Sequence, residues 1–280
     1  MQQSSRFGAP RMVATDLDGT IVRSDGTIST RTVHALLAAE RAGASIVLAT
    51  GRPPRWITTI AEQTDHHGIV ICSNGAIVYD LEAEQILEST LIPVETVAKV
   101  VDILSTALPD LGFAVENGFD VYRSPGYRGG WNVGNEVLPV HDLEVVTSHA
   151  AAKLLASHPE IAADELLVIA RGLVGDLVEP THSNGRGLVE MGPLGVTKGT
   201  ALAHLAAQRG IDREDVVAFG DMPNDLPMLA WAGTGYAMAN AHPDVLAAVE
   251  LTTSSNDDDG VALVLEHLFA QPSRVSAGRR

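Results

Sequence analysis

Hydrophobic and polar positions follow an alternating pattern near the amino-terminal end of the chain. Apolar runs typical of buried strands alternate there with segments of helical length that have one apolar face. The pattern predicts strands at Met12–Thr15, Ser45–Ala49 and Gly68–Cys72, and helices at Thr30–Ala42 and Pro53–Thr64. A β-α-β-α-β order of this kind predicts a parallel sheet with right-handed crossovers, whose strands all end at one edge.

The middle of the chain breaks this alternation. Short strand candidates are separated there by Gly, Pro and Asn turns, which indicates a mixed α+β domain. Its predicted elements are strands at Phe113–Val115, Val121–Arg123, Val145–Val146, Lys153–Ala156, Leu177–Glu179 and Gly187–Met191, and helices at Val94–Leu108 and Pro159–Gly172. The first pattern returns after Thr197, with predicted helices at Thr200–Arg209, Asp225–Ala232 and Val261–Phe269 and strands at Val216–Phe219 and Gly235–Met238.

These patterns predict an α/β fold in which an α+β domain is inserted into a Rossmann-like domain with a parallel sheet. The core domain is expected at residues 1–81 and 193–270, the inserted domain at 82–192, and a mobile tail at 271–280. Hinges between the domains are expected near Ala76–Leu81 and Gly192–Gly195, where the two patterns meet.

The composition is that of a globular protein and argues against polyanionic partners. The chain has 280 residues, 45% of them hydrophobic, which is enough for two domains. Its net charge of -16 repels nucleic-acid backbones and anionic lipid surfaces, so we expect neither as a partner. The single cysteine, Cys72, excludes an intrachain disulfide. Residues 1–11 are polar, and no apolar stretch is long enough to span a bilayer, so we expect a cytoplasmic protein.

Two clusters of acidic residues each follow a predicted strand of the core domain. Asp16 and Asp18 lie in the sequence D-L-D-G-T, and Asp221 and Asp225 lie in G-D-M-P-N-D. Because the carboxyl ends of parallel strands meet at one edge of a sheet, we expect the two clusters to converge. Crowded carboxylates need a cation or protons to coexist, and Mg²⁺ prefers hard oxygen ligands. The sequence therefore predicts a Mg²⁺ site formed by Asp16, Asp18 and Asp221.

A candidate phosphate site lies at the end of the next strand. Thr50 and Gly51 offer a hydroxyl and an accessible backbone N–H there, and Lys198 directly precedes a predicted helix. Taken singly, Thr50 could cap a turn and Lys198 could lie on the surface. Together with the acidic clusters, however, these residues favour binding of a phosphate group.

In this order, the four segments resemble the motifs of the haloacid dehalogenase superfamily of phosphatases, whose nucleophile is an aspartate. Asp16–Thr20 is similar to the first motif of that family, and Thr50 to the second. Lys198 is similar to the third motif and Gly220–Asp225 to the fourth. The resemblance implies an α/β core of the predicted kind.

The inserted domain and two further segments resemble the Cof-type subfamily. The two segments are Gly195–Gly199 and Ala237–Ala241, and the insertion lies between the second and third motifs. Members of this subfamily carry a C2-type cap, which is an α+β domain. The resemblance covers Met12–Leu268, although the cap is similar only in outline.

The resemblance implies Mg²⁺-dependent hydrolysis of phosphate monoesters. Asp16 would attack phosphorus and form an aspartyl-phosphate, and Asp18 would protonate the leaving oxygen and then activate water. Thr20 would support the metal site without binding the ion, and Asp225 would support either the waters of the metal or Lys198. The groups implied to hold the phosphoryl oxygens are Thr50, Lys198, the Asn224 amide and the N–H groups of Leu17 and Gly51.

Small phosphorylated metabolites, such as sugar phosphates or phosphorylated cofactors, are the implied substrates, and the cap is expected to select among them. The cap candidates for substrate contact are Trp131, Tyr127, Arg123, Arg128 and His141, because an aromatic ring and a cation together bind a sugar or a cofactor ring. Trp131 is equally compatible with packing in the core of the cap.

Arg52 and Asn74 lie in loops that leave core strands, so both are candidate substrate contacts, although Asn74-Gly75 is also a common turn sequence. Two other functions fit the same motifs. A phosphosugar mutase would return the phosphoryl group to its substrate, and a module that binds phosphorylated metabolites would keep the fold without turnover.

Overall fold

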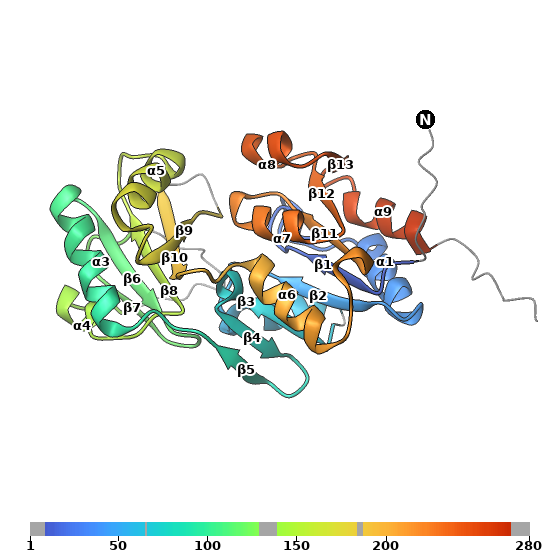
Figure 1. Cartoon of the computed structure of the whole chain (residues 1–280), viewed down its shortest axis with the longest axis horizontal. Helices are drawn as coiled ribbons and strands as arrows, with labels where there is room; N and C mark the ends of the chain where they lie inside the picture. Colours follow the sequence, from blue (N-terminus) through green and yellow to red (C-terminus); the bar gives the residue numbers. More distant parts are fainter. Residues whose placement is uncertain (1–8, 65, 129–138, 184–186, 270–280) are drawn as a thin grey trace, which may run out of the picture.

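The computed structural model describes residues 9–64, 66–128, 139–183 and 187–269, so the predicted tail at 271–280 lies outside the described residues. The chain forms two lobes, each built on its own β-sheet (Figure 1). The chain passes from the first lobe to the second after β5 and returns after β10. The predicted fold class, a Rossmann-like core with an inserted α+β cap, is therefore confirmed.

The core lobe is built on an eight-stranded sheet in the order β13-β12-β11-β1-β2-β3-β4-β5. Its strands are β1 (Met12–Thr15), β2 (Ser45–Ala49), β3 (Ile69–Cys72), β4 (Ile77–Asp80), β5 (Gln85–Ser89), β11 (Val216–Gly220), β12 (Thr234–Met238) and β13 (Leu251–Thr253). The first three and the last three strands are parallel, whereas β4 and β5 pair in antiparallel fashion. The central strand β1 lies between β2 and β11, which is where an open α/β sheet binds its ligands.

Helices cover this sheet so that its central strand is buried along its whole length. The helices are α1 (Thr30–Arg41), α2 (Thr58–Thr64), α6 (Lys198–Gln208), α7 (Leu226–Trp231), α8 (Pro243–Ala248) and α9 (Gly260–Phe269). Helix α1 packs against α9, and α6 packs against α7. Continuous burial of β1 explains why Met12, Val13 and Ala14 are all apolar, because a strand covered on both faces has no polar side. Within the described ranges, no helix is long and apolar enough to cross a membrane.

The cap lobe is built on a five-stranded antiparallel sheet in the order β7-β6-β8-β10-β9. Its elements are α3 (Val94–Ala107), β6 (Gly112–Glu116), β7 (Val121–Arg123), α4 (Leu143–Thr147), β8 (Lys153–Ser157), α5 (Ala163–Val174), β9 (Val178–Thr181) and β10 (Leu188–Pro193). Side chains from α3 and α5 pack with alternate residues of the strands, such as Leu154 and Ala156 of β8, in one hydrophobic core. The other residues of these strands lie on the opposite face of the sheet.

Two predictions about the organisation of the chain differ from the structure. The cap was expected to begin at residue 82, but β5 (Gln85–Ser89) pairs with β4 in the core sheet. A hinge was expected near Ala76–Leu81, but Ile77–Asp80 forms β4 itself. The antiparallel hairpin β4–β5 thus adds two strands to the edge of the core sheet. The first core segment therefore extends to the end of β5.

Some local elements also differ from prediction. Val145 and Val146, expected as a strand, lie in helix α4, which follows Asp142 and carries Glu144 in its first turn, where acidic side chains are favoured. The helix expected at Pro53–Thr64 is divided into a 3-10 turn at Pro54–Trp56 and helix α2. Elements β4, β5, α8 and β13 had no predicted counterpart.

A tight contact between two loops fixes the start of α6. Gly75 ends the 3-10 turn Ser73–Gly75 with φ of +108°, in the left-handed region that favours glycine. A Cβ atom on Gly75 would lie 2.3 Å from the backbone oxygen of Thr197, the residue before α6. Because Gly75 has no side chain, Thr197 can pack directly against it. This contact places Lys198, the first residue of α6, next to the end of β3.

We expect Gly75→Ala to lower the free energy of unfolding by about 3 kcal/mol, because left-handed backbone strain and a backbone clash add together. The matched control is Gly26→Ala, at φ of +83° but with no atom within 4 Å of the added Cβ. It should cost only about 1 kcal/mol, from backbone strain alone. Urea unfolding measures both values, and equal losses in the two variants would contradict the proposed contact.

Candidate active site

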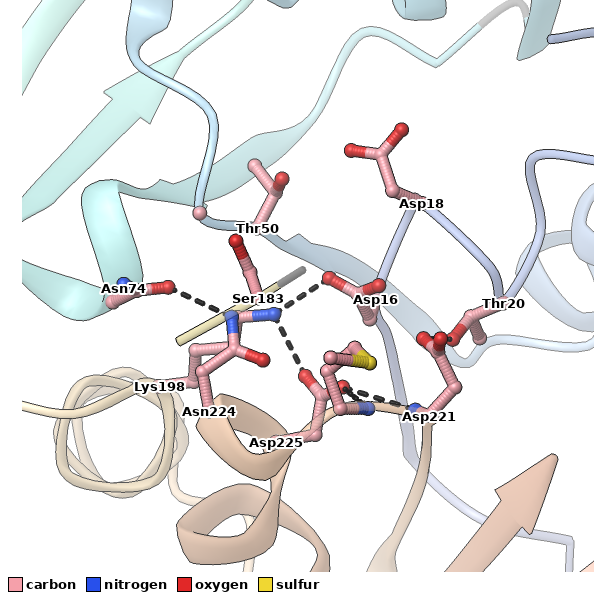
Figure 2. Close-up of polar contacts among 12 residues, drawn as sticks. Asp16, Asp18, Thr20, Thr50, Asn74, Ser183, Lys198, Asp221, Asn224 and Asp225 are labelled. Carbon is pink, nitrogen blue, oxygen red and sulfur yellow. Dashed lines mark hydrogen bonds and ion pairs between the residues drawn. The ribbon is translucent and has the colours of Figure 1, made fainter. Parts of the chain in front are cut away.

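Carboxylates from two neighbouring strand ends meet beside β1. Asp16 follows β1 and Asp221 follows β11, and both side chains are buried. One carboxylate oxygen from each of Asp16, Asp221 and Asp225 lies within 4.8 Å of the other two. Figure 2 shows the three side chains beside one another. The predicted convergence of the two acidic clusters is thus present in the structure, and its cause is the parallel pairing of β1 with β11.

Lys198 lies between two of these carboxylates. It is the first residue of α6, and its Nζ donates hydrogen bonds to Asp16 Oδ1 at 2.6 Å and to Asp225 Oδ1 at 2.7 Å. The side chain is fully buried, which by itself lowers the pKa of the ammonium group. The charges of Asp16 and Asp225 outweigh this effect and hold the pKa of Lys198 above its ordinary value. Lys198 is therefore a permanent cation at the centre of the cluster.

Neighbouring groups hold Asp221 and Asp225 in place. The Thr20 hydroxyl donates to Asp221 Oδ1 at 2.9 Å, and Asp225 Oδ2 accepts from the backbone N–H groups of Asp221 and Met222, both at 3.0 Å. Gly19, at φ of +81°, lies directly against the Asp221 carboxylate, since a Cβ there would be 2.2 Å from Asp221 Oδ2. This contact gives the glycine of D-L-D-G-T a physical role.

The electrostatics of the cluster suit a divalent cation. Burial, the largest effect, raises the pKa of Asp16 to about 7, while Lys198 opposes the change. Burial and the nearby charges of Asp16 and Asp225 also raise the pKa of Asp221 well above its ordinary value. One lysine neutralises only part of the charge of three buried carboxylates, and all the donor atoms are oxygens. These residues therefore fit Mg²⁺, which prefers hard oxygen ligands and keeps some of its waters.

The Asp18 side chain points away from this cluster, as Figure 2 shows. Its carboxylate accepts two hydrogen bonds from Arg52, from Nε at 2.8 Å and from Nη2 at 2.5 Å. The third carboxylate beside Asp16 and Asp221 is thus that of Asp225, whereas Asp18 could offer a metal only its backbone oxygen. Arg52, expected as a substrate contact, is instead the partner of Asp18 in this structure.

Of the five residues expected to bind phosphate, Thr50, Gly51 and Asn224 line a cleft next to Asp16. Leu17 and Lys198 are fully buried and are not among the described residues of its lining. The described residues of its lining are Asp16, Asp18, Thr50, Gly51, Arg52, Trp56, Lys153, Ser183, Met222 and Asn224. The Thr50 hydroxyl accepts a hydrogen bond from the Arg52 N–H at 3.0 Å, so its interpretation as a turn cap also holds. Lys198 is buried behind Asp16. Asn74 contacts Asn224 beside the cleft, with Asn224 Nδ2 donating to Asn74 Oδ1 at 3.0 Å.

The cap supplies residues to this cleft that our sequence analysis did not single out. Lys153 and Ser183 line it, and the buried Glu116 and Glu190 lie next to Lys153. Glu116, Lys153 and Glu190 occupy the alternate positions of β6, β8 and β10 that face away from α3 and α5. A charged residue at such a position inside an otherwise apolar strand was the available sequence signal.

The predicted cap contacts that the structure describes do not line the cleft. Trp131 is outside the described residues. Tyr127 is buried with Ala114, Leu155 and Leu188 in a small hydrophobic cluster. The His141 ring lies 5.5 Å from that of Tyr122, and the lining of the cleft, as far as it is described, includes neither His141, Arg123 nor Arg128.

A buried aspartate–lysine cluster at the strand ends of a capped α/β core is an arrangement suited to phosphoryl transfer. Comparison with protein families agrees, since the haloacid dehalogenase-like hydrolase family matches residues 13–265. The chain belongs to this family, and the resemblance seen in the sequence is confirmed.

The relatives of the chain include phosphatases of similar length. It is 28% identical to the 5-amino-6-(5-phospho-D-ribitylamino)uracil phosphatase YitU of Bacillus subtilis (strain 168), over 93% of this chain and 98% of that protein. It is 27% identical to the pyridoxal phosphate phosphatase YbhA of Escherichia coli (strain K12), over 92% and 99%. The crystal structure of SMU.1108c from Streptococcus mutans UA159 has the same fold, with a TM-score of 0.81 and 24% identity over 94% of this chain and 100% of that one. The expected enzyme class, a hydrolase of phosphate monoesters, agrees with these relatives.

We expect Mg²⁺ to stabilise the protein more at pH 8 than at pH 5. The pKa of Asp16 rises from 3.8 to about 7 on folding without metal, so between these values the folded state binds more protons than the unfolded state. The contribution of Asp16 to the free energy of unfolding is therefore present below pH 3.8 and is lost as the pH rises to about 7. Mg²⁺ competes with these protons and offsets the loss.

Thermal unfolding with Mg²⁺ and with a chelator, at both pH values, measures this effect. Asp221→Asn removes one oxygen ligand and its charge, and should reduce the gain from Mg²⁺ at pH 8. An equal gain at the two pH values in the unaltered protein would show that these carboxylates do not bind the ion.

Proposed function

We propose that the protein is a Mg²⁺-dependent phosphatase that hydrolyses phosphate monoesters of small metabolites through an aspartyl-phosphate on Asp16. The observation that carries the proposal is the placement of Asp16. Its buried carboxylate lies at a cleft, next to the Lys198 cation and the Asp221 carboxylate. A carboxylate is a weak nucleophile, and neutralisation of the phosphate charge makes its attack on phosphorus feasible.

In this proposal, each residue of the cluster has a separate role. Asp16, Asp221 and the backbone oxygen of Asp18 would hold Mg²⁺, which when bound neutralises charge on the phosphoryl oxygens. Lys198 orients Asp16 through its hydrogen bond and is itself held by Asp225. The remaining phosphoryl oxygens would be bound by Thr50, the Asn224 amide and the N–H groups of Leu17 and Gly51.

Asp18 is assigned as the group that protonates the leaving oxygen and then activates water. Both of its oxygens accept hydrogen bonds from Arg52, so this contact has to be exchanged for one with the substrate before Asp18 can act. Arg52 lines the cleft and is then free to contact the leaving group. Binding of substrate and release of Asp18 are thereby coupled in one step.

The cleft supports a small metabolite as the leaving group. Trp56 and Met222 offer apolar surface, while Lys153 and Ser183 of the cap offer hydrogen-bond donors in the same cleft. Two relatives are named for the phosphorylated compounds 5-amino-6-(5-phospho-D-ribitylamino)uracil and pyridoxal phosphate. We propose sugar phosphates and phosphorylated cofactors as the substrate class, and a cytoplasmic location stays a prediction.

The test is phosphate release from sugar phosphates, nucleotides, pyridoxal phosphate and flavin mononucleotide, with Mg²⁺ and with a chelator. We expect release with Mg²⁺ only, and Asp16→Asn should lower kcat by about 10⁴-fold or more, because the nucleophile is lost. Asp18→Asn should lower kcat by about 10²–10⁴-fold, the usual contribution of acid–base catalysis.

The two alternative functions give different results in this experiment. A mutase would convert a sugar phosphate to its isomer with little free phosphate. A binding module would bind the esters and leave all of them intact. Either result would replace the proposed hydrolysis.

A further inference from the structure

A chain of hydrogen bonds connects the cap to the side chain that we assign to phosphate binding. Asn224 Nδ2 donates to Asn74 Oδ1 at 3.0 Å, and Asn74 Nδ2 donates to Glu190 Oε2 at 2.8 Å. Figure 2 shows the contact between the two amides. Asn224 follows β11 and Asn74 follows β3, both in the core, whereas Glu190 belongs to β10 of the cap. This chain of hydrogen bonds from Asn224 through Asn74 to Glu190, which we call the relay, therefore crosses from one lobe to the other.

Glu190 determines which way each amide points. Burial tends to raise the pKa of Glu190, but Lys153, Ser183 and Asn74 together hold it below its ordinary value, so the side chain is an ionised carboxylate. An ionised carboxylate only accepts hydrogen bonds, so Asn74 has to present its NH₂ group to Glu190. The Asn74 oxygen then faces Asn224, which in turn has to present its own NH₂ group.

The orientation of the Asn224 amide determines whether a donor or an acceptor faces an anion in the cleft. One hydrogen of Asn224 Nδ2 binds Asn74, which leaves the second for a phosphoryl oxygen, while the buried Oδ1 of Asn224 has no hydrogen-bond partner in the described structure. If the Asn224 amide were reversed, two carbonyl oxygens would face each other beside Asn74. An oxygen would then also replace the donor at the phosphate site.

The geometry around Gly51 shows how closely these groups converge. A Cβ atom on Gly51 would lie 3.1 Å from Asn74 Oδ1, 3.4 Å from Glu190 Oε2 and 3.7 Å from Asn224 Nδ2. The Gly51 backbone oxygen also accepts a hydrogen bond from Lys153 Nζ at 2.7 Å, and the same Nζ lies 3.1 Å from Glu190 Oε2. Glu190 is part of cap strand β10, so its carboxylate lies beside Gly51 of the core only when the two lobes are in contact.

We propose that Glu190 is a positioning residue: when the cap lies on the core, its carboxylate orients Asn74 and, through Asn74, turns an N–H of Asn224 toward the phosphoryl group. The inference rests on the proposed function of the cleft. It assigns the cap a part in binding the phosphate itself, in addition to contacts with the leaving group. Opening of the cap removes the acceptor and leaves the Asn74 amide without a fixed orientation.

The test is the affinity for inorganic phosphate, measured by calorimetry in the presence of Mg²⁺, which requires no turnover. Glu190→Leu should raise the Kd about tenfold, because it removes the acceptor that dictates how Asn74 points. Gln is unsuitable at this position, since Lys153 Nζ donates to the same Oε2 and would keep an oxygen facing Asn74. Asn74→Asp breaks the same link from the core side by placing two carboxylates in contact, and should weaken binding at least as much. It also keeps the relay testable if one variant does not fold.

The double variant Glu190→Leu with Asn74→Asp provides the decisive measurement. The carboxylate introduced in the core no longer faces a second carboxylate in the cap, and it can only accept, so Asn224 again has to present its NH₂ group. The net charge equals that of the unaltered protein, and Lys153 keeps Gly51 and Glu116 as partners. We expect the Kd for phosphate to return to within about threefold of the starting value, a rescue that a merely structural role of Glu190 would not produce.

Glu116→Leu is the matched control. Glu116 lies opposite Lys153 on the same face of the cap sheet, 3.4 Å from its Nζ, and binds Arg55 at 2.9 Å, so its loss removes an equal charge from the same cluster. It should alter the urea midpoint and leave the Kd for phosphate unchanged within about twofold. Equal weakening by Glu116→Leu and Glu190→Leu, or no rescue in the double variant, would overturn the relay. Absence of phosphate binding by the unaltered protein would instead overturn the proposed function, and the relay with it.

Discussion

The site depends on one electrostatic constraint, which is that three buried carboxylates share a single buried lysine. Carboxylates this close repel one another, and burial makes their charge more costly. The fold keeps them together through the parallel pairing of β1 with β11 and through the packing of α6, which fixes Lys198 between Asp16 and Asp225. The charge that Lys198 does not neutralise makes the same place attractive for a divalent cation and, through that cation, for a phosphate.

A second group of buried charges lies where the cap contacts the core. Arg55 of the core pairs with Glu116 of the cap, and Lys153 of the cap reaches the Gly51 backbone oxygen as well as Glu190. Buried ion pairs contribute little net stability, because desolvation offsets much of their attraction. Their stronger effect here is on orientation, since each pair has one geometry in which all its hydrogen bonds are made. The lobes are thereby held in one relative placement, at the point where the cleft is formed.

The sequence predicted the core of the site better than its surroundings. The two acidic motifs end strands of a parallel sheet, and that topology alone brings Asp16 and Asp221 together. Hairpin β4–β5 was not predicted, because the parallel pattern before it gives no sign that the sheet continues with antiparallel strands. Glu190 was not predicted either: its role follows from which face of β10 the helices leave uncovered, and this depends on packing between segments far apart in the chain. The pairing of Asp18 with Arg52 likewise depends on a side-chain conformation that no motif specifies.

The contrast between the global and the local charge explains how an acidic protein can bind an anion selectively. The net charge of -16 acts over the whole surface, but at physiological ionic strength salt screens it beyond about 8 Å. Inside the cleft, Arg52 and Lys153 lie within reach of a bound phosphate ester, and Lys198 is screened from water by burial. A small ester that enters fully therefore meets local cations, whereas a polyanion that extends across the surface meets the acidic exterior. The same charge distribution is therefore unfavourable for a nucleic acid and compatible with the small phosphorylated substrate that we propose.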